Sequence, residues 1–135
     1  MGAPRVVRKV RNLTLDAGAL IAYERRDRLV RDTIHTALAA GMEVRVPAGA
    51  LAQVWRDGRR QVELRVLLRN NLVKVADLTE PAAKASGELC GRSGTRDVID
   101  ASVVVCVRQQ RGAAVLTSDP ADLRRLDAAL QVEAV

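Results

Sequence analysis

The chain has 135 residues, of which 48% are hydrophobic and 28% charged, and it carries a formal net charge of +6 at pH 7. This length and balance are typical of one folded domain with one hydrophobic core, and they exclude a two-domain enzyme, a disordered chain and a fibrous repeat. The positive charge favours polyanionic partners such as nucleic acid, while one Trp, one Tyr and no Phe argue against proteins that bind single strands by stacking bases on aromatic rings.

Short apolar runs alternate along the chain with longer segments of helical periodicity. After a basic arm at residues 1–11, the first half predicts a strand at 12–15, helices at 16–23 and 27–40, a strand at 44–46, helices at 48–55 and 62–69, and a strand at 72–75. The second half predicts a helix at 80–89, a loop at 91–94, a helix at 97–110, a strand at 113–116, a helix at 120–130 and a strand at 131–135. The helix at 97–110 has an almost wholly apolar middle, so we expect it to be buried.

This alternation predicts an α/β fold, because parallel strands must be joined by crossover connections and those connections supply the helices. We expect a single domain over residues 1–135, with three α/β/α layers and a central parallel sheet of about five strands. The apolar run at 101–107 is far shorter than the roughly 20 residues of a membrane span, and no signal-like segment opens the chain, so we expect a cytoplasmic protein with no membrane partner. Cys90 and Cys106 are too few and too unpatterned for a disulfide framework or a zinc site.

Aspartates follow two of the predicted strands and open the buried helix. Asp16 comes directly after the first strand, and Asp119 follows the strand at 113–116. Asp97 and Asp100 are three residues apart at the start of the buried helix, so they share one of its faces. Because ligands of parallel sheets collect beyond the carboxyl ends of the strands, we expect these four carboxylates to converge at that edge.

Each aspartate also has a purely structural interpretation. Asp16, Asp97 and Asp119 could cap the helices that follow them, and Asp100 gains from the dipole of its helix. The dipole does not explain a carboxylate on the apolar side of a buried helix, where a charge is costly unless something offsets it. A bound divalent cation is the strongest offset, and ligands that are all oxygen suit Mg²⁺ or Mn²⁺.

Three stretches, LTLDAGAL at 13–20, DVIDASVV at 97–104 and LTSD at 116–119, resemble the PIN-domain ribonucleases, in particular the toxins of VapBC toxin–antitoxin modules. Their order and spacing cover nearly the whole chain. The resemblance implies a PIN-like fold, and the family's three aspartates match Asp16, Asp100 and Asp119. Asp97 is an additional acid one helical turn before Asp100.

The resemblance further implies a metal-dependent endoribonuclease that cuts RNA and is silenced by a cognate antitoxin, and it leads us to expect a homodimer. A Mg²⁺ or Mn²⁺ ion would lower the pKa of a bound water and stabilise the charge that develops on the phosphate. The residues expected to hold the cation are Asp16, Asp97, Asp100 and Asp119. The residues considered for supporting roles are Gln53, Thr117, Ser118 and Asp122.

Gln53 is a departure from the family, which usually carries a glutamate on the helix after the second strand. Its carbonyl oxygen can still ligate a cation, but the site loses one negative charge, for which Asp57 could substitute through water. This departure supports an alternative function, a catalytically weakened or inactive PIN-like module that binds RNA or protein. A nucleotide-binding domain is disfavoured because neither a G-x-G-x-x-G nor a Walker motif follows the first strand. His35 is expected at the surface or its boundary rather than in acid–base chemistry.

Overall fold

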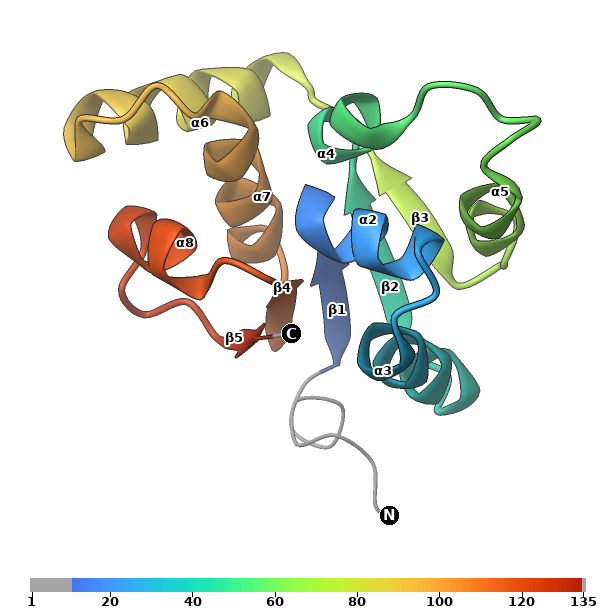
Figure 1. The fold of residues 1–135 in the computed structure, drawn as a ribbon. Coiled ribbons are helices and arrows are strands. Elements are labelled where there is room, and N and C mark those ends of the chain that lie inside the picture. The colour runs from blue at the N-terminus through green and yellow to red at the C-terminus, as the bar shows by residue number, and fades with distance from the viewer. Residues whose placement is uncertain (1–10, 135) are drawn as a thin grey trace.

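Five short strands pair in parallel in the order β3-β2-β1-β4-β5 in the computed structural model, which describes residues 11–134 (Figure 1). The strands are β1 (Asn12–Leu15), β2 (Glu43–Pro47), β3 (Val73–Ala76), β4 (Ala113–Thr117) and β5 (Val132–Ala134). The helices are α2 (Ala17–Glu24), α3 (Arg28–Ala39), α4 (Ala48–Val54), α5 (Val62–Leu68), α6 (Glu80–Ser93), α7 (Val98–Arg108) and α8 (Pro120–Leu126). The expected α/β fold with a parallel sheet of about five strands is confirmed.

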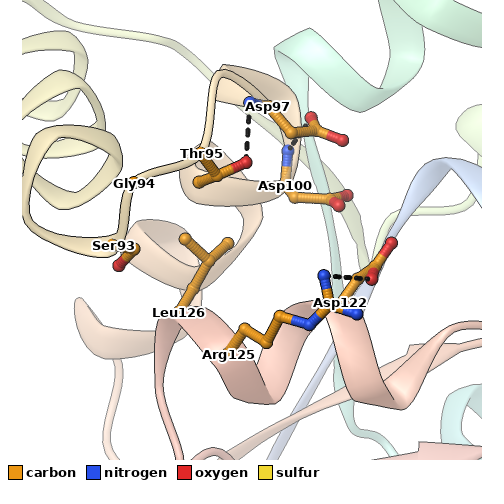
Figure 2. A pocket seen from close by; sticks show the side chains of 8 residues that line it. All are labelled: Ser93, Gly94, Thr95, Asp97, Asp100, Asp122, Arg125 and Leu126. Atoms are coloured by element: carbon orange, nitrogen blue, oxygen red, sulfur yellow. Dashed lines mark hydrogen bonds and ion pairs between the residues drawn. The ribbon is translucent and has the colours of Figure 1, made fainter.

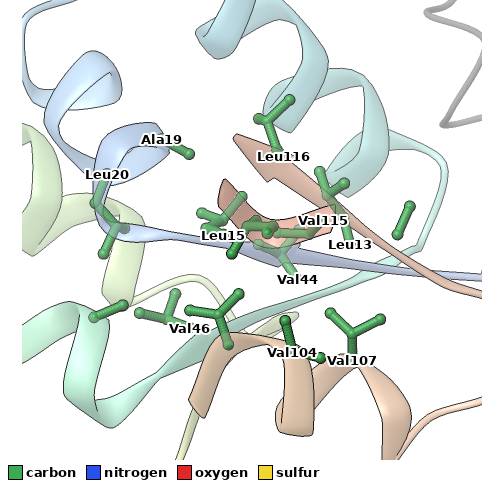
Figure 3. Close-up of a cluster of buried hydrophobic side chains, with 14 of the residues drawn as sticks. Leu13, Leu15, Ala19, Leu20, Val44, Val46, Val104, Val107, Val115 and Leu116 are labelled. Carbon is green, nitrogen blue, oxygen red and sulfur yellow. The ribbon is translucent and has the colours of Figure 1, made fainter. Parts of the chain in front are cut away.

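Helices cover both faces of the sheet, as the close-up of the core shows (Figure 3). Ala19 of α2 lies on one side of the strands, while Val104 and Val107 of α7 lie on the other. The central strands β1 and β4 are buried on both faces, so Leu13 and Leu116 have no exposed surface. This three-layer arrangement follows from parallel pairing, which leaves both faces of the sheet to be covered by the crossover helices.

The central pair of strands ends at the same edge of the sheet. In the register of β1 with β4, Leu15 lies opposite Leu116, so the residues that follow each strand leave the sheet close together. The chain enters α2 after β1 and enters α8 after β4. The predicted helix at 97–110 is α7, whose residues from Ala101 to Val107 are all buried. It packs against both the sheet and α6.

Two predicted boundaries are wrong. The segment 91–94 was expected to be a loop, but α6 continues through Gly91 and ends at Ser93, because the residue that adopts the left-handed conformation of a helix end is Gly94, with a φ of 70°. The helix expected at 120–130 ends at Leu126. Asp127 leaves the helical conformation, accepts a hydrogen bond from the Ala129 amide and pairs with Arg108 at 2.9 Å.

The remaining expectations concern the basic arm, the cysteines and membrane-spanning segments. The basic arm at residues 1–11 lies outside the described residues except for Arg11. Cys106 is buried as expected for a core residue, and both cysteines are free thiols. Within residues 11–134, no helix combines the length and the apolar character that crossing a membrane requires.

Candidate active site

Asp16 lies at the point where β1 becomes α2. Its side chain accepts a hydrogen bond from the Ala19 amide at 2.8 Å, so it caps α2, and only 6% of its surface is exposed. The Thr117 hydroxyl at the end of β4 also hydrogen-bonds this carboxylate. The buried carboxyl group is therefore held in one orientation by two neighbouring elements.

Asp97 and Asp100 open α7. Asp97 caps the helix by accepting the Asp100 amide at 3.0 Å, and its own amide donates to the Thr95 hydroxyl oxygen at 3.2 Å. Asp97 is exposed, whereas Asp100 is half-buried at the start of the apolar part of the helix. Capping thus accounts for Asp97, but it does not account for the carboxylate of Asp100.

Asp119 and Asp122 lie on the connection from β4 into α8. Asp119 caps α8 by accepting the Asp122 amide at 3.4 Å, and its own amide donates to Thr117 Oγ1 at 2.9 Å. The buried Thr117 therefore links the Asp16 carboxylate to the backbone that carries Asp119. Ser118 is exposed between them and packs against Gly18, where an added Cβ would overlap the Ser118 hydroxyl and lie 3.4 Å from Asp16 Oδ1.

A pocket of about 240 Å³ lies between the start of α7, the end of α6 and α8. Figure 2 shows the carboxylates of Asp97, Asp100 and Asp122 turned to the same side of this pocket, with Arg125 extended along α8 towards Asp122. The other residues that line the pocket are Ser93, Gly94, Thr95 and Leu126. The pocket thus opens beside three of the five aspartates.

The five aspartates form one electrostatic cluster. Burial raises the pKa of Asp16, and the charge of Asp119 raises it further, while the bonds from Thr117 and Ala19 oppose the rise. Burial, followed by the charge and hydrogen bond of Asp97 and the charges of Asp16 and Asp122, raises the pKa of Asp100 to about 7. A hydrogen bond and charge repulsion from Asp119 raise the pKa of Asp122. The cluster destabilises its own negative charge, which a cation would relieve.

The oxygen donors of the cluster are of the kind that hard divalent cations prefer, but they are not close enough together to coordinate one. Within residues 11–134, no group of three or more His, Cys, Asp or Glu side chains stands close enough together to hold a metal ion. All the available donors are oxygens, which Mg²⁺ and Mn²⁺ prefer. Asp97 and Asp119 are exposed, and exposed side chains change rotamer readily. The donor chemistry suits such a cation, and coordination would require these side chains to turn towards it.

Gln53 is not among the residues that line the pocket. It is exposed on α4, one helical turn after Gly49, whose added Cβ would lie 3.0 Å from Ile99 of α7. Residues four apart share a helix face, so Gln53 lies on the face of α4 that packs towards the start of α7. Asp57 lies in the loop after α4, where its side chain accepts the Arg59 amide at 3.0 Å. His35 is exposed, as expected, and its Nε2 lies 2.8 Å from the Tyr23 hydroxyl.

Two residues beside the cluster were not predicted. Arg125 is three residues after Asp122, a spacing that places both on one face of α8 and could have suggested the contact. The contact of Gly18 with Ser118 depends on the approach of α2 to the end of β4, and no local sequence signal indicates it.

The PIN domain family model matches residues 13–129 of the chain. No curated protein sequence matches the chain significantly. Among solved structures, VapBC2 from Rickettsia felis, bound to a DNA fragment from its promoter, is similar with 14% identity and a TM-score of 0.68 over 92% of this chain and 98% of that chain.

Two further structures share the fold. FitAcB from Neisseria gonorrhoeae is similar with 17% identity and a TM-score of 0.60, over 89% of this chain and 95% of that chain. VapC20 from Mycobacterium tuberculosis, a toxin that cleaves the sarcin-ricin loop, is similar with 17% identity and a TM-score of 0.60, over 87% of this chain and 95% of that chain. At these identities the likeness establishes the fold.

Proposed function

Because the chain belongs to the PIN domain family, we propose that it is a metal-dependent endoribonuclease that cuts RNA with a divalent cation, Mg²⁺ or Mn²⁺, held by its clustered aspartates. The observation that carries the proposal is the pairwise electrostatic coupling of Asp16 with Asp119 and of Asp100 with Asp16, three residues that come from different elements. Helix capping explains Asp16 and Asp119 one at a time, but it gives no reason for the charge of Asp119 to raise the pKa of Asp16, or for the charge of Asp16 to raise the pKa of Asp100.

The residues have distinct parts in this proposal. Asp16, Asp100 and Asp119 would hold the cation, with Asp97 and Asp122 at its margin. When bound, the cation would neutralise charge on the phosphate and acidify a water. Thr117 would keep Asp16 oriented through its hydroxyl, and it supports Asp119 through the backbone amide. Ser118, which is exposed beside both acids, would donate a hydrogen bond to the attacking water or to the phosphate.

The first test is RNA cleavage by the purified protein with and without chelator. We expect cleavage of single-stranded or looped RNA in Mg²⁺ or Mn²⁺, and we expect EDTA to abolish it, because clustered carboxylates have no positive charge with which to stabilise a phosphate in the transition state. Equal cleavage in EDTA and in Mg²⁺, by protein free of contaminating nuclease, would contradict the metal mechanism.

The second test uses two matched N-cap variants. Asn caps a helix about as well as Asp, so Asp16→Asn keeps the cap of α2 while removing one charge from the cluster. Asp27→Asn makes the same change at the cap of α3, where Asp27 accepts the Val30 amide at 3.0 Å. We expect Asp16→Asn to lower the rate of cleavage at least about 100-fold, the scale of losing one electrostatic group from an active site, and Asp27→Asn to leave it unchanged.

We also propose that the chain is the toxin of a toxin–antitoxin pair in the cytoplasm and that its partner is an antitoxin protein. The similar structures of VapBC2 and FitAcB support this proposal. Co-expression with the product of a neighbouring small gene, followed by purification through a tag on one chain, tests it. We expect a stable complex in which RNA cleavage is suppressed. Elution of the two proteins separately, with this chain still cutting RNA, would contradict the proposal. The same preparation, measured by light scattering, tests the expected homodimer.

A catalytically inactive RNA- or protein-binding module is the second candidate function, and Gln53 is the observation that favours it. The charge of the usual glutamate is missing on the α4 face that packs towards α7. RNA binding without cleavage in either Mg²⁺ or Mn²⁺ would support this second function over the first.

A further inference from the structure

One positively charged side chain, Arg125, lines the pocket of Figure 2 among the residues that the structure describes. Three of the other lining residues are aspartates. The Arg125 side chain is 79% exposed, and its Nη1 lies 3.6 Å from Asp122 Oδ1. We propose that Arg125 is a substrate-binding residue that holds an RNA phosphate next to the phosphate being cut, a role that rests on the ribonuclease function proposed above.

The charge of the pocket creates the need for such a residue. RNA brings a phosphate with every nucleotide, but one cation at the cluster can neutralise only the phosphate that it touches. The neighbouring phosphate would then lie beside Asp97, Asp100 and Asp122. A guanidinium on the wall that α8 supplies, next to Asp122, offsets that repulsion, and its planar set of N–H donors fits two oxygens of one phosphate.

The contact that Arg125 makes in the free protein is easily exchanged. Its partner Asp122 has 44% of its side chain exposed, and exposed pairs of this kind contribute little to stability. Water can take the place of the guanidinium at this partly exposed carboxylate. Turning the guanidinium from Asp122 to a phosphate therefore leaves no buried group without a partner.

The remainder of the pocket suits a sugar and phosphate. Its volume of about 240 Å³ is below the roughly 300–1,000 Å³ of pockets that enclose whole drug-sized ligands. Thr95 Oγ1 accepts the Asp97 amide, so its O–H can donate to a ligand oxygen. Gly94 beside it leaves open space where a side chain would project. A short piece of the RNA sugar–phosphate backbone suits this pocket better than a base stacked on an aromatic ring, because none of the described residues that line the pocket is aromatic.

The helix that carries Arg125 is fixed in place. Leu123 and Leu126 of α8 are buried, with 1% and 7% of their surface exposed. Arg124, the preceding residue, is exposed on the same helix but does not line the pocket. The two arginines therefore offer the same charge on the same helix, and only one of them faces the pocket.

Arg125→Ala and Arg124→Ala form the matched test. A fluorescein-labelled single-stranded RNA of mixed sequence is titrated with wild type and each variant in EDTA, so that binding is measured without cleavage. We expect Arg125→Ala to weaken binding about 10-fold, the scale of one charge-assisted contact, and to reduce the slope of log affinity against log salt by about one. We expect Arg124→Ala to change affinity less than 2-fold. In Mg²⁺, the KM of Arg125→Ala for RNA should rise by a similar factor while kcat changes little.

A third comparison separates direct binding from an effect through Asp122. If Arg125 contacts phosphate itself, Arg125→Ala causes the same loss of affinity in an Asp122→Asn background as in wild type. A loss that disappears in that background, or equal losses for Arg124→Ala and Arg125→Ala, would overturn the proposal while leaving the ribonuclease function standing. A wild-type protein that neither binds nor cuts RNA would overturn both.

Discussion

Replacing Asp100 with Asn tests whether the buried negative charge of the acidic cluster lowers the protein's free energy of unfolding. The pKa of this carboxyl is raised from 3.8 to about 7 by burial and by its acidic neighbours, which means that the folded state disfavours its charge. When the pKa of a carboxyl is higher in the folded state than in the unfolded state, the free energy of unfolding falls as pH rises from the unfolded-state pKa to the folded-state pKa. The wild-type free energy of unfolding should therefore carry a penalty that grows between about pH 4 and pH 7.

The size of that penalty follows from the shift. About 3 pKa units correspond to about 4 kcal/mol at 1.36 kcal/mol per unit. Because Asp100 keeps part of its surface in water, which screens its neighbours, we expect about half of this, or about 2 kcal/mol. Asp100→Asn removes the charge and keeps the Asp97 cap, because the cap bonds to the backbone amide of residue 100.

Urea unfolding in EDTA at a series of pH values measures the effect. We expect Asp100→Asn to be more stable than wild type by about 2 kcal/mol at pH 8, with the difference shrinking towards zero near pH 4, and to have lost RNA cleavage. Asp32→Asn, at an exposed position within α3, is the control and should show no such pH-dependent gain. A marked loss of stability in Asp100→Asn at pH 8 would instead show that Asp100 is a structural residue.

Two other substitutions give further predictions. Gln53→Glu adds a carboxylate on the α4 face that packs towards α7, so it should tighten Mn²⁺ binding in calorimetry and raise activity at limiting Mg²⁺; unchanged or weaker binding removes Gln53 from the site. Gly18→Ala should lower activity with little loss of thermal stability, because its Cβ forces the exposed Ser118 hydroxyl beside Asp16 to rotate away while Ala favours helices by up to about 1 kcal/mol. Wild-type activity in Gly18→Ala would show that the position of the Ser118 hydroxyl is unimportant.

The sequence predicted the fold well where its local signals agree. Runs such as that before Asp16 are short and apolar and are followed by good helix caps, so their boundaries are recovered almost to the residue. Boundaries fail where tertiary contacts override those signals. Gly91 is tolerated inside α6 at a cost of about 1 kcal/mol, and the helix end falls at Gly94 instead. The apolar Leu130 suggested a longer α8, but Asp127 ends the helix and pairs with Arg108.

In the candidate site, too, features that follow from local signals and topology could be predicted, whereas those that depend on tertiary contacts could not. The sequence predicts that Asp16 and Asp119 leave the sheet at one edge, because parallel topology brings the carboxyl ends of β1 and β4 together there, and the Asp100 carboxyl lies close enough for the charge of Asp16 to raise its pKa. The hydrogen bond from Thr117 to Asp16 joins residues about one hundred positions apart, and the pocket wall at Arg125 forms only when α8 packs beside α6 and α7. Such contacts depend on how elements meet, which periodicity and propensity do not encode.

An anomalous difference map, recorded at the manganese absorption edge from crystals grown with MnCl₂, would show whether the aspartates hold the cation. Mn²⁺ has the same preference for oxygen ligands as Mg²⁺ and can be located by its own scattering. We expect a peak bounded by the carboxylates of Asp16, Asp100 and Asp119, and we expect that peak to be lost in Asp16→Asn but not in Asp27→Asn. A map with no peak at this edge of the sheet, from crystals of protein that cuts RNA in the same buffer, would contradict the claim that these aspartates hold the catalytic cation.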